Sequence, residues 1–247
     1  MSYKELFIRT IEVNKDQSKL SHSTVFEILY RRASFFITPF FLRVGVSPNL
    51  ISGLVFIMGL ISSALIFSST DANVRLGVIV FFFASVIDYV DGNVARMINR
   101  TSFYGRFIDG LIDIVILSAV RFALCRFIMV RIEDEFLFWI GIISCVLTPL
   151  HHLIYDRFSA LSRWCNDENG TKIKPYIRRK ASPRITFLVI DFQYLLFYLI
   201  PILFNFSILR YLLLFYFLTN IVSAVHVILS HIIHSYRSMN VNANAHR

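Results

Sequence analysis

The stretch DYVDGNVARMINRTSFYGRFIDGLID, residues 88–113, places four aspartates and three arginines in a chain that is otherwise strongly apolar. Asp88 and Asp91 are three residues apart, whereas Asp109 and Asp113 are four apart. Either spacing puts both members of a pair on one face of a helix. The residues between the pairs are numerous enough to reverse the chain. We therefore expect the two pairs to face each other across an antiparallel helical hairpin.

The surroundings of this stretch indicate a membrane protein. The 247 residues include 25 Phe and have a mean hydropathy of +0.62, outside the range of an ordinary soluble domain. A helix needs about 20 mostly apolar residues to cross the ~30 Å hydrocarbon layer. The sequence therefore predicts an all-α, polytopic membrane protein with six transmembrane helices. The expected spans are residues 49–70, 74–96, 105–130, 136–155, 184–206 and 208–234.

The remaining segments divide the chain simply. Residues 1–22 are expected to form a polar N-terminal tail, and 23–46 an amphipathic helix lying in the membrane interface, because apolar clusters alternate there with charged residues. The six-span membrane domain is expected to cover 47–235, since Pro48 disfavours helical geometry in the residue before it. Residues 236–247 would be a short cytoplasmic tail.

The distribution of Lys and Arg predicts the orientation. Seven of them lie in the first 43 residues and eight in 156–184, whereas the alternate links hold few. Short loops rich in these residues stay cytoplasmic. We expect a protein integral to the cell (inner) membrane, with both termini and the aspartate-rich turn facing the cytoplasm. The net charge of +9 follows this loop asymmetry and favours contact with membrane lipids, not nucleic acid.

Four carboxylates inside a membrane hairpin require a function. Each charge near the bilayer centre costs about 3 kcal/mol even on a lenient scale. Two unit charges 4 Å apart repel by about 4 kcal/mol at an effective dielectric of 20, so the cluster is stable only if it binds cations or protons. Hard oxygen ligands beside a phosphate-bearing substrate favour Mg²⁺ or Mn²⁺, and the number of carboxylates suits two ions.

Small residues and one arginine accompany the aspartates. Gly92, Ala95 and Gly105 keep side chains small on the faces that would line the hollow, so a bulky ligand can approach the backbone. Arg96 lies one turn beyond Gly92, and its fork of donors suits a phosphate. The pattern predicts a site for a phosphorylated ligand held by metal ions.

These residues resemble a known signature. Asp88-x-x-Asp91-Gly92-x-x-Ala95-Arg96, eight residues, then Gly105-x-x-x-Asp109-x-x-x-Asp113 is similar, position for position, to the motif of the CDP-alcohol phosphotransferase family, also called CDP-alcohol phosphatidyltransferases. The resemblance extends to the six spans, the interfacial helix and the Ser-Pro-Asn at 47–49.

The resemblance implies transfer of a substituted phosphate from a CDP-linked alcohol, either CDP-diacylglycerol or a CDP-polyol, to an acceptor alcohol, with release of CMP. It would make the six-span domain catalytic, in phospholipid or related glycan biosynthesis, and it suggests a homodimer. The implied metal ligands are Asp88, Asp91, Asp109 and Asp113, with Asp113 also the general base, and the implied CDP-binding residues are Asn49, Gly92, Ala95, Arg96 and Gly105.

The acceptor, an alcohol or a phosphorylated polyol, is less well specified. Relatives that use phosphorylated acceptors bind the phosphate with arginines near the fifth span, which nominates Arg178, Arg179 and Arg184 here. Positive-inside charge also explains these residues. Arg121 and Arg126 lie inside the third span, where pairing, snorkelling or a wet cavity would satisfy them, and we interpret both as structural.

Two other functions use intramembrane carboxylates. A membrane prenyltransferase holds a diphosphate through aspartates and Mg²⁺, but it would carry a second aspartate motif. An ion-binding transporter would explain the carboxylates without chemistry. It would not require Gly92, Ala95, Arg96 and Gly105 at these distances.

Overall fold

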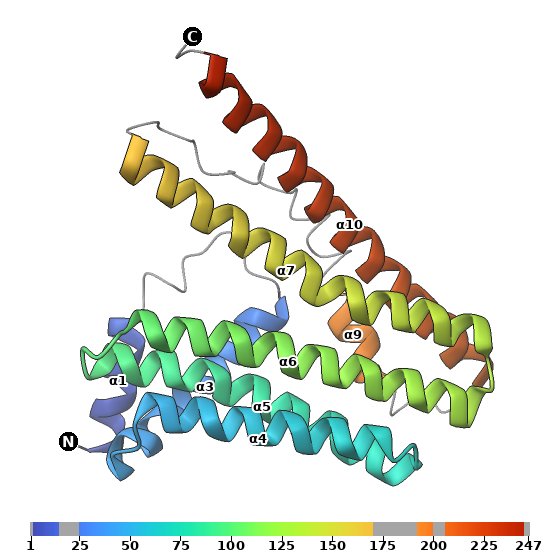
Figure 1. Ribbon diagram of the computed structural model, residues 1–247. Helices are drawn as coiled ribbons and strands as arrows, with labels where there is room; N and C mark the ends of the chain where they lie inside the picture. The colour runs from blue at the N-terminus through green and yellow to red at the C-terminus, as the bar shows by residue number, and fades with distance from the viewer. Residues whose placement is uncertain (1, 15–24, 170–191, 200–205, 245–247) are drawn as a thin grey trace.

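The computed structural model describes residues 2–14, 25–169, 192–199 and 206–244, and these are predominantly helical (Figure 1). No strand occurs in these ranges, which confirms the all-α prediction. The helices are α1 (Tyr3–Val13), α3 (Val25–Val44), α4 (Pro48–Phe67), α5 (Asp71–Met97), α6 (Phe103–Phe127), the π-helical turn η1 (Ile128–Ile132), α7 (Glu135–Asn169), α9 (Phe192–Leu199) and α10 (Phe206–Asn244).

Helix α1 is a feature that the predicted polar tail does not include. Ser2 caps this helix: its side chain accepts a hydrogen bond from the Glu5 amide, and the Glu5 carboxylate accepts one from the Ser2 amide. This capping box is readable in the sequence as Ser-x-x-Glu. The helix packs against α3 and α5, and the Tyr3 hydroxyl donates to the Phe36 carbonyl of α3. The N-terminal residues are therefore part of the helical assembly.

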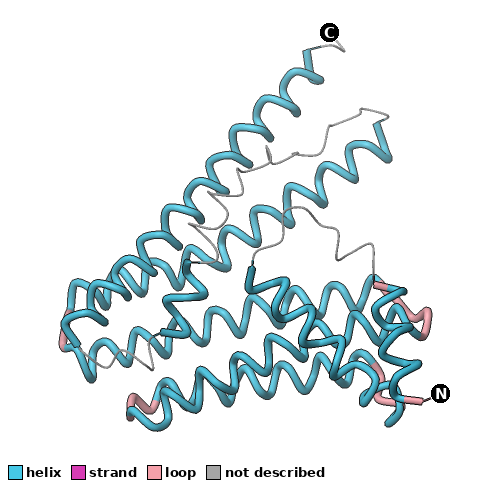
Figure 2. The backbone as a smooth tube through the Cα atoms, turned by 180° about the vertical axis from the view of Figure 1, so that it is seen from behind, coloured by secondary structure: helices cyan, strands magenta, loops and turns pink. Residues whose placement is uncertain are grey.

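Helices α4, α5 and α6 lie side by side, whereas α7 and α10 run together and diverge from them toward their C-terminal ends (Figures 1 and 2). The contact between α4 and α5 is close because Gly77 has no side chain. A Cβ placed on Gly77 would lie 2.9 Å from the Ser62 carbonyl oxygen, and the Ser62 hydroxyl donates to the Gly77 carbonyl at 2.8 Å. Small residues commonly permit such backbone approach between membrane helices.

Four of the described helices contain segments long and apolar enough to cross a membrane. They are Pro48–Phe67, Asp71–Met97, Glu135–Leu161 and Ile208–Tyr236, and they support an integral membrane protein. Helix α6 has sufficient length but carries five charged residues. The predicted fifth span, 184–206, lies mostly outside the described residues. Six spans therefore remain a prediction.

Two arginines at the end of the bundle opposite the aspartates form ion pairs. Arg131 forms an ion pair with Asp71 at the start of α5, and Arg210 forms one with Asp134 just before α7. Two of the few arginines in the alternate links are thus neutralised locally.

Candidate active site

The C-terminal end of α5 and the start of α6 bring the aspartates together. Ser102 caps α6, and its hydroxyl accepts a 2.9 Å hydrogen bond from the Gly105 amide, which fixes where the returning helix begins. Asp88, Asp91 and Asp109 each offer a carboxylate oxygen within 4.8 Å of those of the other two. These three aspartates therefore converge across the hairpin, as the spacing predicts.

A serine of α4 donates a hydrogen bond to one of these three carboxylates. The Asp91 side chain is buried, and the Ser52 hydroxyl donates a hydrogen bond to it. Sequence reasoning missed Ser52, although it follows Asn49 by three residues on the same helix. A hydroxyl donor stabilises the ionised carboxylate and orients its oxygens.

Asp113 stands beside the group of three and not within it. Its side chain is exposed, and it lines a pocket of about 150 Å³ together with Asp88. Tyrosines of three different helices, Tyr30, Tyr89 and Tyr194, form much of the wall. We call this the aspartate pocket. Asp113 therefore shares this pocket with Asp88 while it lies outside the group of three.

Tyr30 of α3 is a second residue that the sequence did not nominate. It is almost fully buried, and its hydroxyl lies 2.6 Å from that of Tyr198 on α9. Burial, reinforced by Tyr198, raises the pKa of the Tyr30 phenol far above its usual range. It therefore remains protonated and closes one side of the aspartate pocket as a neutral hydrogen-bonding group.

The three carboxylates fit a hard divalent cation. At separations of 4.8 Å or less, each pair of unit charges would repel by about 3.5 kcal/mol or more at an effective dielectric of 20. A cation between them converts this repulsion into attraction. Carboxylate oxygens are the ligands that Mg²⁺ and Mn²⁺ prefer. The donor set thus fits the predicted cofactor, with Asp88, Asp91 and Asp109 as the residues that would hold it.

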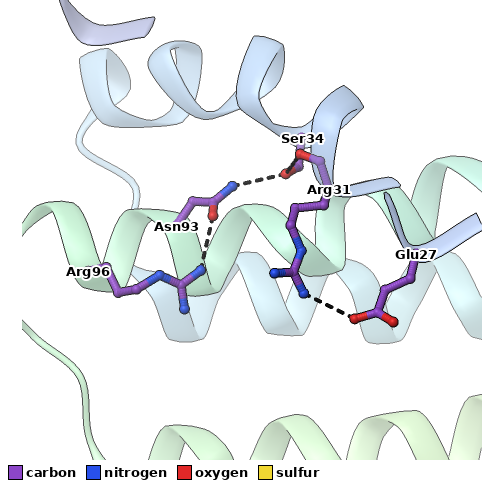
Figure 3. Close-up of polar contacts among 5 residues, drawn as sticks. All are labelled: Glu27, Arg31, Ser34, Asn93 and Arg96. Atoms are coloured by element: carbon purple, nitrogen blue, oxygen red, sulfur yellow. Dashed lines mark hydrogen bonds and ion pairs between the residues drawn. The ribbon is translucent and has the colours of Figure 1, made fainter. Parts of the chain in front are cut away.

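Arg96 is held by side chains of α5 and of the segment that follows α1. Its Nη2 donates to the side-chain oxygen of Asn93 at 3.0 Å, and its Nε donates to the side-chain oxygen of Asn14 at 2.5 Å. Figure 3 shows Arg96 and Asn93 linked along α5, and Asn93 linked onward to Ser34 of α3. Arg96 is therefore oriented in advance, as a phosphate-binding residue would need to be.

Gly92 lies next to the Arg96 guanidinium. A Cβ on Gly92 would lie 3.2 Å from both terminal nitrogens of the Arg96 guanidinium, so the arginine lies over the glycine. The prediction that Gly92 also leaves room for a ligand stays a prediction. Because Gly92 has no side chain, the Arg96 guanidinium can lie close to the backbone of α5.

The other predicted nucleotide contacts lie at the same hairpin. Asn49, at the start of α4, is exposed, and its side-chain oxygen is 4.0 Å from where a Cβ on Gly105 would be. Ala95 is half-buried on α5. The structure therefore groups Asn49 with Gly105 beside the aspartates. Arg178, Arg179 and Arg184 lie outside the described residues.

The family model for CDP-alcohol phosphatidyltransferase matches residues 45–230, well over half of the chain. The chain belongs to this family. It is 38% identical over 96 residues to a phosphatidylinositol phosphate synthase of Streptomyces avermitilis, a match that covers 37% of this chain and 38% of that protein. It is 30% identical over 86 residues to a CDP-diacylglycerol–glycerol-3-phosphate 3-phosphatidyltransferase of Haemophilus influenzae, covering 35% and 40% of the two chains. These matches span well under two thirds of the relatives' length.

Solved structures show the same fold for this family member. Phosphatidylinositol phosphate synthase of Mycobacterium tuberculosis, crystallised with manganese and citrate, superposes with a TM-score of 0.54 at 20% identity, covering 78% of this chain and 87% of that one. The structure of that enzyme with CDP-DAG bound gives the same TM-score and covers 91% of its chain. Helices α1 and α3 precede the matched family region, so Asn14 and Ser34 contact Arg96 and Asn93 from outside it.

Proposed function

We propose that the protein transfers a substituted phosphate from a CDP-linked alcohol, CDP-diacylglycerol or a CDP-polyol, to the hydroxyl of an acceptor alcohol, with release of CMP, in phospholipid or related glycan biosynthesis. The observation that carries the proposal is the convergence of Asp88, Asp91 and Asp109 across the α5–α6 hairpin, in a chain of this family. Family membership also favours transfer over the prenyltransferase and transporter alternatives.

The proposed reaction depends on divalent metal ions. Asp88, Asp91 and Asp109 would hold Mg²⁺ or Mn²⁺, with a second ion sharing Asp113, and bound cations would make the phosphorus electrophilic and neutralise the leaving CMP. The manganese-bound relative supports a divalent ion. Arg96, fixed by Asn93, would contact the phosphates of the donor.

Asp113 would act as the general base. Its carboxylate lies outside the close group of three and opens into the aspartate pocket, where an acceptor hydroxyl can reach it. The acceptor oxygen would form a new bond to the phosphorus that bears the donor's alcohol. The bond from that phosphorus to the CMP oxygen would break, and the acceptor's proton would pass to Asp113.

Oxygen labelling tests the bond-forming step. We expect an acceptor labelled with ¹⁸O in its hydroxyl to keep the label in the lipid product, as read by mass spectrometry, with none in CMP. Label in CMP or its loss to water would contradict direct transfer. Offering one CDP-lipid with glycerol phosphate, inositol phosphate, serine and free polyols in competition would identify the acceptor.

The proposal also covers the orientation of the protein in the membrane and its oligomeric state. The active site and both termini would face the cytoplasm, supported by the basic segments and by the neutralised arginines at the other end. A cysteine placed at Ser102 is expected to react with an impermeant reagent only from the cytoplasmic side, and labelling only from outside would contradict this. A homodimer, suggested by the family resemblance, is testable by light scattering of the purified protein.

A further inference from the structure

Helix α1 docks on α3 through one side. The Phe7 ring stacks on the Phe36 ring of α3 with 5.0 Å between the ring centroids, and the Tyr3 hydroxyl donates a hydrogen bond to the Phe36 carbonyl. Further along α1, Thr10 and the following Asn14 are almost fully buried. An isolated helix of eleven residues is marginal in water, so packing and its surroundings stabilise α1 as a helix.

The two docked helices share a row of uncovered apolar side chains. Tyr3, Phe7 and Ile11 follow one another at a spacing of four residues, which places them along one side of α1. The same spacing places Phe36 and Phe40 together on α3, where they are 61% and 60% exposed. The stack between Phe7 and Phe36 joins the two rows. We call these five residues the apolar patch.

The apolar patch lies close to the membrane along the chain. Helix α3 ends at Val44, and α4, which is long and apolar enough to cross a membrane, begins at Pro48. Exposed apolar patches mark interaction sites, since burying one large apolar side chain stabilises by about 1.5–3 kcal/mol. The lipid surface is therefore the nearest apolar medium that can cover the patch.

The charges around the apolar patch fit a lipid surface better than a second copy of the chain. Arg32 precedes the patch by one turn of α3, and the guanidinium carbon of Arg43 lies 5.7 Å from the centre of the Tyr3 ring. By helical periodicity, Glu5 and Glu12 lie on the side of α1 away from the patch. Basic side chains extend from apolar surfaces to lipid phosphates, each contributing about 1 kcal/mol at an anionic membrane. A second copy would instead bring the same cations face to face.

The buried side of α1 reaches the arginine assigned to the donor. Asn14 follows the last residue of α1, and its side-chain nitrogen donates to the Thr10 carbonyl at 2.7 Å. This bond turns the side-chain oxygen of Asn14 toward Arg96, whose Nε donates to it at 2.5 Å. The C-terminal end of α1 therefore orients the amide that holds Arg96. If α1 leaves α3, Arg96 loses this acceptor.

We propose that α1 is a second membrane-surface helix, that its apolar patch rests on the lipid headgroup region at the end of the bundle that carries the aspartates, and that this contact keeps Asn14 on Arg96. The sequence pattern predicts an interfacial helix only at 23–46, and the matched family region begins at residue 45. Asn14 is thus a positioning residue that acts through Arg96. The effect on the donor rests on the proposed function, whereas the lipid contact does not.

Fluorescence quenching tests the lipid contact without any substrate. Ile11→Trp and its control Val13→Trp place a fluorophore on α1 at positions that are 38% and 45% exposed, on different sides of the helix. Each protein is reconstituted in phosphatidylcholine–phosphatidylglycerol vesicles that contain lipids brominated high in the acyl chains. The emission of the wild type, which has two tryptophans, is subtracted. We expect strong quenching of Ile11→Trp and little quenching of Val13→Trp.

Two results of this measurement would overturn the lipid contact. One is equal quenching of the two variants, or no quenching of Ile11→Trp. The other is a blue-shifted emission of Ile11→Trp that brominated lipid does not quench, which would assign the apolar patch to a protein neighbour such as a second copy.

Donor kinetics test the link from the apolar patch to Arg96. Ile11→Glu places a charge in the patch, whereas Val13→Glu makes the same change outside it. We expect Ile11→Glu to raise the KM for CDP-diacylglycerol about 2- to 10-fold with kcat changed less than about twofold, and Val13→Glu to match the wild type. Because the effect passes through Asn14, adding Ile11→Glu to Asn14→Ala should raise the KM no further than Asn14→Ala alone.

An unchanged KM in Ile11→Glu would overturn the link to Arg96, and so would an additive rise in the double variant. If Ile11→Glu does not fold, Phe40→Glu alters the same patch from α3 and is expected to raise the KM by a similar factor. A wild-type KM in Phe40→Glu would then count against the link. If no CMP forms with any donor, the proposed transfer fails, but the quenching of Ile11→Trp still decides whether α1 lies on lipid.

Discussion

Replacing Asp88 by Asn should stabilise the metal-free protein and remove most of its response to metal. Asp88 contributes one of three carboxylates whose ligand atoms lie within 4.8 Å of one another. Each of its two pairings is then repulsive by about 3.5 kcal/mol or more at an effective dielectric of 20. A proton shared within the cluster relieves part of this repulsion, so we expect a measurable gain on the order of 1–2 kcal/mol. For a chain of this size that corresponds to a rise in Tm of about 2–4 °C per kcal/mol.

The assay is thermal unfolding of the purified protein, without metal and across a Mn²⁺ titration. The wild type should gain stability as Mn²⁺ binds, because a ligand that binds only the folded state stabilises it by mass action. Asp88→Asn should begin higher and gain less. Asp156→Asn makes the same chemical change at an exposed position of α7 outside the cluster, and should leave both quantities as in the wild type. A variant that begins lower and keeps the full Mn²⁺ response would refute the electrostatic reasoning.

Three further substitutions test other parts of the structure. Asp113→Asn should lower kcat by about 10²–10⁴-fold, the usual loss when a general base is removed, while donor affinity changes little; normal turnover would assign the base elsewhere. Asn14→Ala should raise the KM for the CDP-alcohol by about 2- to 10-fold, because Arg96 loses a buried hydrogen-bond acceptor. Asn14→Asp keeps an acceptor oxygen and should return the KM to the wild-type value. An unchanged KM in Asn14→Ala would make the contact incidental. Gly77→Ala should cost about 1–3 kcal/mol of stability by forcing α4 from α5, whereas Gly53→Ala, which meets nothing within 4 Å, should be neutral or slightly stabilising; equal Tm values would contradict the packing account.

The aspartate cluster was predictable because it depends on local geometry. Spacings of three and four residues fix helix faces, and a short polar link fixes an antiparallel return, so Asp88, Asp91 and Asp109 had to approach one another once the hairpin formed. The separate position of Asp113 was not predictable. Its distance from the other three depends on how α6 is rotated against α5, which packing with other helices decides.

Contacts between segments far apart in the chain could not be predicted from the sequence pattern. Asn14 reaches Arg96 across 82 positions, and no periodicity links an exposed-looking polar residue to that arginine. The Ser-x-x-Glu capping box at Ser2 indicates helix α1, whereas the surrounding charge favours a polar tail. Arg121 and Arg126 look identical in sequence, since only the packing of α7, α9 and α10 determines which of them is buried.

Release of CMP from a CDP-alcohol is the step that distinguishes a CDP-alcohol phosphotransferase from a transporter. Purified protein would be supplied with CDP-diacylglycerol or a CDP-polyol, Mg²⁺ or Mn²⁺, and the acceptor panel, and CMP would be quantified beside the alcohol-transfer product. We expect equal amounts of CMP and product, only when metal and acceptor are both present, and a loss of both in Asp91→Asn. Absence of CMP with every donor and acceptor, together with metal-dependent solute flux in proteoliposomes, would contradict it.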